Sequence, residues 1–149
     1  MVCDETKILR WETQRKEFLA EVLGSLEVGD VDLEGDPFSL LAAVDAFNAS
    51  QDFGAMDEDD WGWLHTFLAA YIAQIFIVEH NARWEIITDN GRDSYLLSVN
   101  SPGGVSRSFD PMELVFNDFH KGLPPEAVRM LATAESITGV TPEVPPEYL

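Results

Sequence analysis

The dipeptide Asn90-Gly91 is the strongest constraint on the fold, because it interrupts a run in which apolar and polar residues alternate. A two-residue type I′ hairpin turn requires positive φ at both central residues, and Asn-Gly is the pair that best meets this requirement. With these two residues as the loop, Thr88 pairs with Asp93. This register places five apolar side chains on one face of the hairpin: Trp84, Ile86, Tyr95, Leu97 and Val99. Turn chemistry and burial therefore predict the same antiparallel hairpin.

Helical periodicity is found on both sides of this hairpin. Several aspartates stand where they can cap a helix N-terminus, and two of them precede a proline at the first helical position. The expected helices are Lys7 to Leu23, Asp36-Pro37 through Phe47, about Asp60 to Glu79, Asp110-Pro111 to about His120, and Pro124-Pro125 to about Ile137. Residues 101–104 form a second turn, from which residues 105–109 can return as a third strand.

These elements predict an α+β fold with N-terminal helices, a small antiparallel three-stranded meander and C-terminal helices. Residues 1–140 are expected to form a single compact domain, and the proline-rich residues 141–149 are expected to form an extended tail. The helix from about Asp60 to Glu79 carries apolar residues around most of its circumference. We therefore expect it at the centre, packed against the apolar face of the hairpin.

Three features bear on the compartment in which the protein works. One cysteine, Cys3, cannot form an internal disulfide or a cysteine-based zinc site. The N-terminus lacks the basic start and the apolar run of a signal peptide. The longest apolar stretch, Phe67 to Val78, has 12 residues, whereas a membrane-spanning helix needs about 20. These features predict a cytoplasmic protein that does not span a membrane.

The charge of the chain is unusual in sign. There are 9 Lys and Arg residues against 27 Asp and Glu residues, which gives a formal charge of −18. No Lys or Arg occurs from Glu17 to Ala82, a span that contains 14 acids. Such a surface repels phosphate backbones and anionic headgroups, so direct binding of nucleic acid or a membrane is disfavoured and a basic protein partner is favoured. A solvated face that keeps the protein soluble is the alternative explanation.

Two parts of this base-free span are candidates for a partner-binding surface. Four consecutive carboxylates occupy a predicted helix N-terminus directly before two tryptophans. The helix dipole alone stabilises acids at such a position, but a tryptophan among carboxylates is also the composition of a hot spot for a basic partner. The candidate residues are Asp57, Glu58, Asp59, Asp60, Trp61, Trp63, Asp30, Asp32 and Glu34. Because Trp61 and Trp63 are two residues apart on a helix, they face different ways, and we expect one to be partly exposed.

Metal and cofactor chemistry has little support in the sequence. Asp30, Asp32 and Glu34 match the start of an EF-hand loop, but Leu41 stands where that loop needs a bidentate glutamate. The three histidines do not share a zinc-binding spacing. We therefore predict no metal site, no cofactor and no catalytic residue.

The stretch from Ala70 to Trp84, followed by a short meander and the Asp110-Pro111 helix start, resembles a pattern seen in small acidic bacterial proteins of unknown function. In that pattern a helix of the form A-Y-x-G-x-x runs into a tryptophan-bearing strand, and Ala73 stands here in place of the glycine. Some proteins of this type are immunity proteins of toxin systems. The resemblance covers about residues 60 to 120, implies a bacterial cytosolic binding protein, and supplies no catalytic residues.

Two hypotheses for the function follow. The first is a cytosolic, non-enzymatic interaction protein whose acidic surface binds, and can neutralise, a basic protein in the manner of an immunity protein or a DNA mimic. The alternative is a small hydrolase or ligand-binding domain with carboxylates in a cleft between the meander and the helices. Convergent polar groups and shifted carboxylate pKa values in a pocket would favour the alternative.

Overall fold

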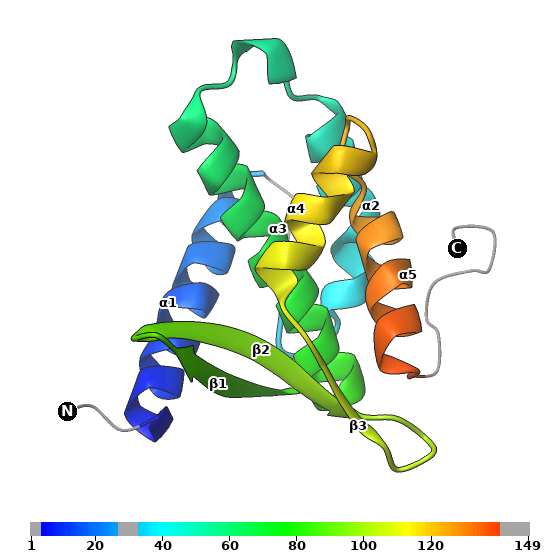
Figure 1. The fold of residues 1–149 in the computed structure, drawn as a ribbon. Helices are drawn as coiled ribbons and strands as arrows, with labels where there is room; N and C mark the ends of the chain where they lie inside the picture. The colour runs from blue at the N-terminus through cyan, green and yellow to red at the C-terminus, as the bar shows by residue number, and fades with distance from the viewer. Residues whose placement is uncertain (1–3, 27–32, 141–149) are drawn as a thin grey trace.

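The computed structural model describes residues 4–26 and 33–140 of the chain. Within these residues there are five α-helices, two short 3-10 helices and one three-stranded antiparallel sheet (Figure 1). The elements are α1 (Asp4–Ser25), η1 (Pro37–Leu40), α2 (Leu41–Ala49), η2 (Phe53–Ala55), α3 (Glu58–His80), β1 (Arg83–Asp89), β2 (Arg92–Asn100), β3 (Ser106–Phe109), α4 (Pro111–Lys121) and α5 (Ala127–Thr138). The expected α+β class is confirmed. The expected tail at residues 141–149 lies outside the described residues, as does Cys3.

Helix α3 lies at the centre of the fold, between α1 and the C-terminal helices (Figure 1). Every residue from Phe67 to Phe76 is buried, because α3 contacts α1, α4, α5 and β2. By length and composition alone, this helix could cross a membrane. Its apolar surface is instead covered by the other elements, which is the environment of a central core helix.

The hairpin has the expected register. Thr88 pairs with Asp93 in the β1–β2 ladder, and β3 continues the meander on the other side of β2. Asn90 and Gly91 have φ values of 51° and 77°, which are the positive values that a type I′ turn requires. Burial on the apolar face is graded, because Leu97 and Val99 are fully buried whereas Trp84, Ile86 and Tyr95 are only partly buried.

The sheet contacts three helices, of which only α3 was expected, and β3 lies against α5. Near the open end of the hairpin, β2 contacts α3, whereas β1 contacts α1. Trp11 of α1 stacks on Tyr95 with ring centroids 4.1 Å apart and meets Trp84 edge-on at 5.6 Å. A nine-residue strand is about 30 Å long and a helix is only about 10 Å wide. One helix therefore cannot cover the hairpin, and α1 covers the part that α3 does not reach.

The two Asp-Pro helix starts differ. Asp110 caps α4 as expected, because its carboxylate accepts hydrogen bonds from the backbone N–H groups of Met112 at 2.9 Å and Glu113 at 3.4 Å. Asp36 does not cap a helix through its side chain. The segment after it forms the 3-10 helix η1, and regular α-helix begins only at α2.

Candidate functional site

The four consecutive carboxylates, Asp57, Glu58, Asp59 and Asp60, form the N-cap and the first turn of α3, and we call them the acidic tip. All four side chains are exposed. The carboxylate of Asp57 accepts from the N–H of Asp60 at 2.9 Å, and the carboxylate of Asp60 accepts from the N–H of Asp57 at 3.2 Å. This reciprocal capping box stabilises the helix start. Glu58 and Asp59 take no part in the capping box, so they are the members of the tip without that structural task.

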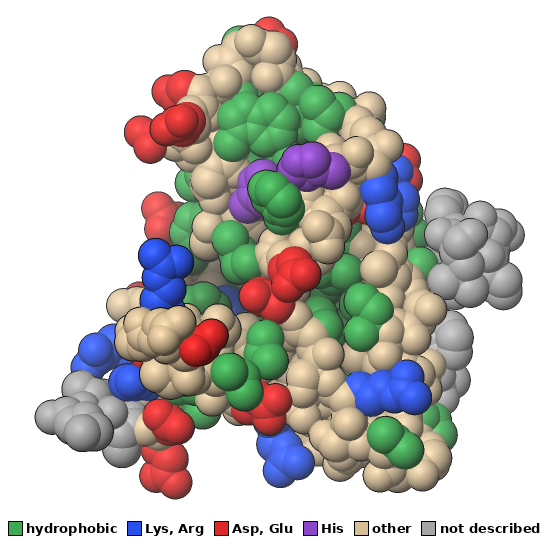
Figure 2. All heavy atoms as spheres, in the orientation of Figure 1, with side chains coloured by type: hydrophobic (Ala, Val, Ile, Leu, Met, Phe, Trp, Pro, Cys, Tyr) green, Lys and Arg blue, Asp and Glu red, His purple; other side chains and the backbone are tan. Residues whose placement is uncertain are grey.

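The view in Figure 2 shows acidic side chains gathered at the upper left, where Figure 1 places the start of α3. Among the described residues on this face, no Lys or Arg side chain lies between them. Carboxylates that project from a helix N-terminus into solvent produce a local negative potential. The acidic tip can therefore attract a cationic partner over a distance of about a Debye length.

The two tryptophans next to the tip face different elements, as their spacing predicts. Trp61 is partly buried and packs against Phe119 of α4, with ring centroids 5.4 Å apart. Trp63 packs between α1 and α2, with its ring centroid 6.2 Å from that of Phe18 and 6.0 Å from that of Phe47. It nevertheless remains 40% exposed. The expectation that one tryptophan is partly exposed is confirmed, and Trp63 is the more exposed of the two.

Trp63 lines a surface hollow of about 360 Å³, which we call the Trp63 hollow. Its lining residues come from the end of α2, from η2 and from the start of α3: Phe47, Gln51, Asp52, Ala55, Met56, Asp60 and Trp63. Two carboxylates thus share a concave surface with an exposed indole and a thioether. Such a lining suits the side chain of Lys or Arg, whose methylenes pack on apolar groups while the cationic end reaches a carboxylate.

The second candidate segment does not join the acidic tip. Asp30 and Asp32 lie outside the described residues. Glu34 is exposed and forms an ion pair with Lys16 of α1 at 3.5 Å. The neighbouring Leu33 carbonyl accepts a hydrogen bond from Gln74, which lies 14 residues beyond Asp60 on α3. That separation corresponds to about 21 Å of helical rise, so Glu34 and the tip are separate features.

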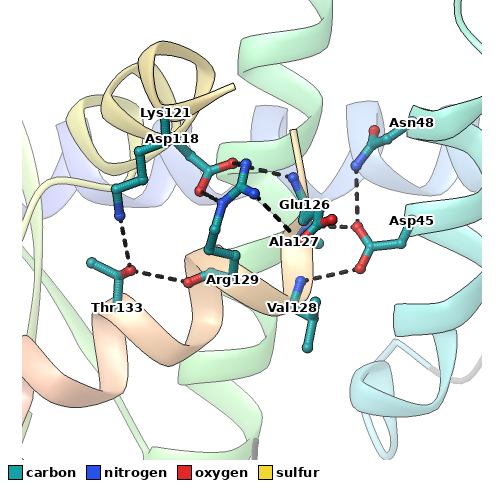
Figure 3. A network of polar contacts seen from close by, with 9 residues as sticks. All are labelled: Asp45, Asn48, Asp118, Lys121, Glu126, Ala127, Val128, Arg129 and Thr133. Atoms are coloured by element: carbon teal, nitrogen blue, oxygen red, sulfur yellow. Dashed lines mark hydrogen bonds and ion pairs between the residues drawn. The ribbon is translucent and has the colours of Figure 1, made fainter. Parts of the chain in front are cut away.

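Another acid of the base-free span has an internal role. Asp45 of α2 accepts hydrogen bonds from the backbone N–H groups of Ala127 and Val128, so it caps the N-terminus of α5 from a different helix (Figure 3). Burial raises the pKa of Asp45, although these two N–H groups oppose the increase. The span therefore contains fewer recognition charges than its composition suggests. Asp45 is 82 residues from its partner, and no local sequence signal connects the two.

An ion pair between a buried carboxylate and a partly exposed arginine completes the start of α5. Asp118 of α4, only 2% exposed, accepts hydrogen bonds from Arg129 at 2.6 and 2.8 Å and from the backbone N–H of Glu126 at 3.1 Å (Figure 3). The hydrogen bond to Asp118 raises the pKa of Arg129. The sequence predicts a helix start at Pro124-Pro125, but α5 begins at Ala127. The carboxylates of α2 and α4 fix the start at that point, because they satisfy its free N–H groups.

No group of three or more potential metal ligands occurs within residues 4–26 and 33–140. His65 and His120 each use Nδ1 to donate a hydrogen bond to the backbone carbonyl four residues earlier, at 2.7 and 2.9 Å. Their surroundings are aromatic, because the ring centroid of His65 lies 4.0 Å from that of Phe119. His65 therefore belongs to the packing between α3 and α4, whereas the side chain of His120 is exposed and contacts Phe116 of its own helix.

The alternative hypothesis requires carboxylates in a cleft between the meander and the helices. A cleft of about 340 Å³ does lie between β3, α4 and α5, and Asp110, Glu113 and Asp118 are among its lining residues. Asp110 caps α4, and Asp118 is bound by Arg129. Glu113 has neither role. The cleft therefore does not present two unengaged carboxylates that could act as an acid–base pair.

Comparisons of the chain with models of known protein families, with curated proteins and with solved structures find no match.

Proposed function

We propose that this protein is a cytosolic, non-enzymatic interaction protein that binds a basic protein through the acidic tip and the Trp63 hollow, and so neutralises it in the manner of an immunity protein or a DNA mimic. One observation carries the proposal. The exposed indole of Trp63 and the carboxylates of Asp52 and Asp60 line the same hollow, within a span from Glu17 to Ala82 that contains no Lys or Arg. A solvated acidic face does not need an exposed aromatic side chain in a hollow beside its carboxylates.

The proposed contact uses two kinds of interaction. A Lys or Arg side chain of the partner enters the hollow, its methylenes lie on Trp63 and Met56, and its charge reaches Asp52 or Asp60. A cation over an indole contributes about 0.5–2 kcal/mol, depending on how much water is excluded. Glu58 and Asp59 lie outside the hollow lining, and their role is to accelerate association and orient the partner by long-range attraction.

A test that separates a specific surface from net charge needs matched variants. The test variant combines Asp52→Asn, Glu58→Gln and Asp59→Asn, which leaves the Asp57–Asp60 capping box intact. The control variant combines Asp4→Asn and Glu5→Gln, both in the first turn of α1, with Asp89→Asn at the end of β1 beside the hairpin turn. Each variant removes three negative charges from exposed positions. The probe is a hexa-arginine peptide with blocked termini, titrated while amide and indole NMR signals are recorded.

The proposal predicts that the peptide shifts the Trp63 indole signal and the amides of residues 52–63. At low ionic strength the test variant should bind about tenfold more weakly, as expected for the loss of several exposed ion pairs, whereas the control should change by less than about twofold. The difference should shrink as salt rises above about 0.15 M, where the Debye length is about 8 Å. Equal weakening in the two variants, or no shift at Trp63, would leave solubility as the explanation of the acidic surface.

A further inference from the structure

The cleft between β3, α4 and α5 lies outside the acidic tip and combines polar and apolar walls. It has a volume of about 340 Å³, which is within the range of small-molecule sites. The lining residues that matter for binding are Glu113, Leu114, Asn117, Lys121, Met130 and Ile137. Leu114 and Met130 are buried at its base, whereas Ile137 of α5 is 44% exposed. The cleft can therefore hold an apolar group between the two helices.

The polar wall of the cleft has a regular arrangement. Glu113, Asn117 and Lys121 follow each other at intervals of four residues on α4, and residues at this spacing lie on one helix face. The wall therefore presents a carboxylate, an amide and an ammonium group in a line. The Cα atoms of Glu113 and Lys121 are about 12 Å apart along the helix axis. Figure 3 shows Lys121 reaching from α4 toward Thr133 of α5.

These three side chains are the ones with bonding capacity to spare. Asp118 is occupied by Arg129, Asp110 caps α4, and Ser108 donates a hydrogen bond to Glu85 at 2.9 Å. The ammonium group of Lys121 donates one hydrogen bond, to Thr133 at 3.5 Å, and forms no ion pair with any described residue. Within residues 4–26 and 33–140, the side chains of Glu113 and Asn117 have no hydrogen-bond partner. The cleft thus has an unengaged negative charge near one end and an unengaged positive charge near the other.

The charges select the class of ligand. A ligand with a net negative charge would be repelled by a protein whose formal charge is −18. A ligand with only positive charge would leave Lys121 without a counter-ion and place a like charge beside it. A zwitterion can pair its positive group with Glu113 and its negative group with Lys121. Because its net charge is zero, the negative charge of the protein does not repel it. Three residues of extended peptide span about 10 Å, which is close to the separation of about 12 Å between the Cα atoms of Glu113 and Lys121 along the helix axis.

We propose that this cleft binds a short zwitterionic peptide of about three residues, with its terminal amine at Glu113, its terminal carboxylate at Lys121 and an apolar side chain between α4 and α5. Asn117 lies midway and can hydrogen-bond to the peptide backbone. The site is independent of the proposed recognition of a basic protein, because it shares no residue with the acidic tip or the Trp63 hollow.

The probe for the test is the tripeptide Ala-Leu-Ala with free termini, titrated into the whole protein while amide NMR signals are followed. A ligand of this size with exposed charges is expected to bind with a Kd on the order of 1 mM. Shifts should be concentrated in residues 108–137. Two further peptides test the two charged contacts separately. The N-acetylated form lacks the terminal amine, and the C-terminal amide lacks the terminal carboxylate. Each should bind about fivefold more weakly, as expected for the loss of one well-placed exposed ion pair.

The variants Lys121→Gln and Glu113→Gln assign the two ends. In Lys121→Gln, the free acid and the C-terminal amide should bind equally, while the effect of N-acetylation remains. Glu113→Gln should show the reverse. The controls are Arg92→Gln at the hairpin turn and Glu58→Gln in the acidic tip, neither of which should change the affinity. Absence of shifts in residues 108–137, or equal binding of all three peptides to the unaltered protein, would overturn the proposal, whatever the result with hexa-arginine.

Discussion

The indole ring of Trp11 lies parallel to the phenol ring of Tyr95, with centroids 4.1 Å apart and planes inclined by 4°. This stack joins α1 to the hairpin across 84 residues of sequence. Trp84 closes the same cluster, because it meets Trp11 edge-on and donates a hydrogen bond from Nε1 to Glu12. Aromatic pairs of these two geometries contribute about 0.5–1.5 kcal/mol each beyond the area they bury. The cluster therefore attaches the hairpin to α1.

The first prediction concerns this attachment. Trp84→Ala should lower the free energy of unfolding by about 3 kcal/mol, the lower end of the range for large aromatic residues, because Trp84 is only partly buried. The measurement is urea unfolding followed by circular dichroism. Ile87→Ala is the control, since Ile87 is 49% exposed on the other face of the strand and should cost no more than about 0.5 kcal/mol. A loss below about 1 kcal/mol for Trp84→Ala would contradict the proposed attachment.

The second prediction concerns the cap that α2 provides for α5. Asp45→Ala should destabilise the protein by about 1–2 kcal/mol, because it leaves the N–H groups of Ala127 and Val128 without their acceptor. Asp52→Ala serves as the matched control, because Asp52 makes no capping hydrogen bond through its side chain at the start of η2. Both values can be read from urea unfolding at neutral pH. Equal effects of the two substitutions would show that the cap contributes nothing.

The third prediction concerns the ion pair between α4 and α5. Arg129→Ala should cost about 3–5 kcal/mol, because Asp118 would remain as a buried charge without its counter-ion. Adding Asp118→Asn to this variant should recover part of the loss, because the second substitution removes the buried charge. A double-mutant cycle in urea measures the recovery. The two residues are not coupled if Asp118→Asn lowers the free energy of unfolding by the same amount in the Arg129→Ala variant as it does in the unaltered protein.

The fourth prediction concerns metals. We expect folding not to depend on a metal, so chelation of divalent ions should change the midpoint of thermal unfolding by no more than about 1 °C. Removal of a metal linked to folding would lower the midpoint much more. The acids from Asp30 to Glu34 are the segment at issue, since they match the start of a calcium loop. Differential scanning calorimetry with and without EDTA provides the measurement. A decrease of several degrees that calcium reverses would show that this segment holds an ion.

Local signals in the sequence predict the elements of this fold well. The turn at Asn90-Gly91 alone sets the register of β1 and β2, because turn type and strand pairing depend on neighbouring residues. The cap of α4 follows from Asp110 in the same way, whereas for α3 the sequence leaves Asp57 and Asp59 as alternative caps, and Asp57 is the one used. Exposure of one tryptophan at the start of α3 also follows from local spacing, since residues two apart on a helix face different ways.

The sequence predicts that the central helix packs on the hairpin, but the individual side-chain contacts between distant segments were not predictable. Arg15, only 7% exposed, donates hydrogen bonds to the carbonyl of Ala70 at 3.1 Å and to Gln74 at 2.8 Å. In the sequence it is simply the penultimate base before a long acidic span. Asp45 likewise reads as one more surface acid, although it caps α5. The Trp63 hollow needs α2, η2 and α3 together, and no single segment carries a signal for it.

The last prediction uses two acids whose pKa values shift in opposite directions. Burial alone would raise the pKa of Glu12, but the hydrogen bonds and charge of Arg15 outweigh it and hold the pKa below 4.5. Burial raises the pKa of Asp45 above 3.8. Glu12 therefore contributes stability that is present above pH 4.5 and is lost as the pH falls through its folded-state pKa. Asp45 acts in the opposite sense. Its protonated form contributes stability that is present below pH 3.8 and is lost as the pH rises through its folded-state pKa.

Removing each group should therefore change the acid limb of the stability curve in opposite ways. Between about pH 3 and pH 6 the free energy of unfolding of Glu12→Gln should fall less steeply on acidification than that of the unaltered protein, and that of Asp45→Asn should fall more steeply. Urea unfolding at closely spaced pH values measures both slopes, and each is compared with the slope of the unaltered protein, so other titrating groups cancel. Because the two signs are opposite, a general effect of lost negative charge would shift both curves in the same direction. Parallel shifts would therefore show that Arg15 does not act on Glu12 and that burial does not act on Asp45 in the way the contacts imply.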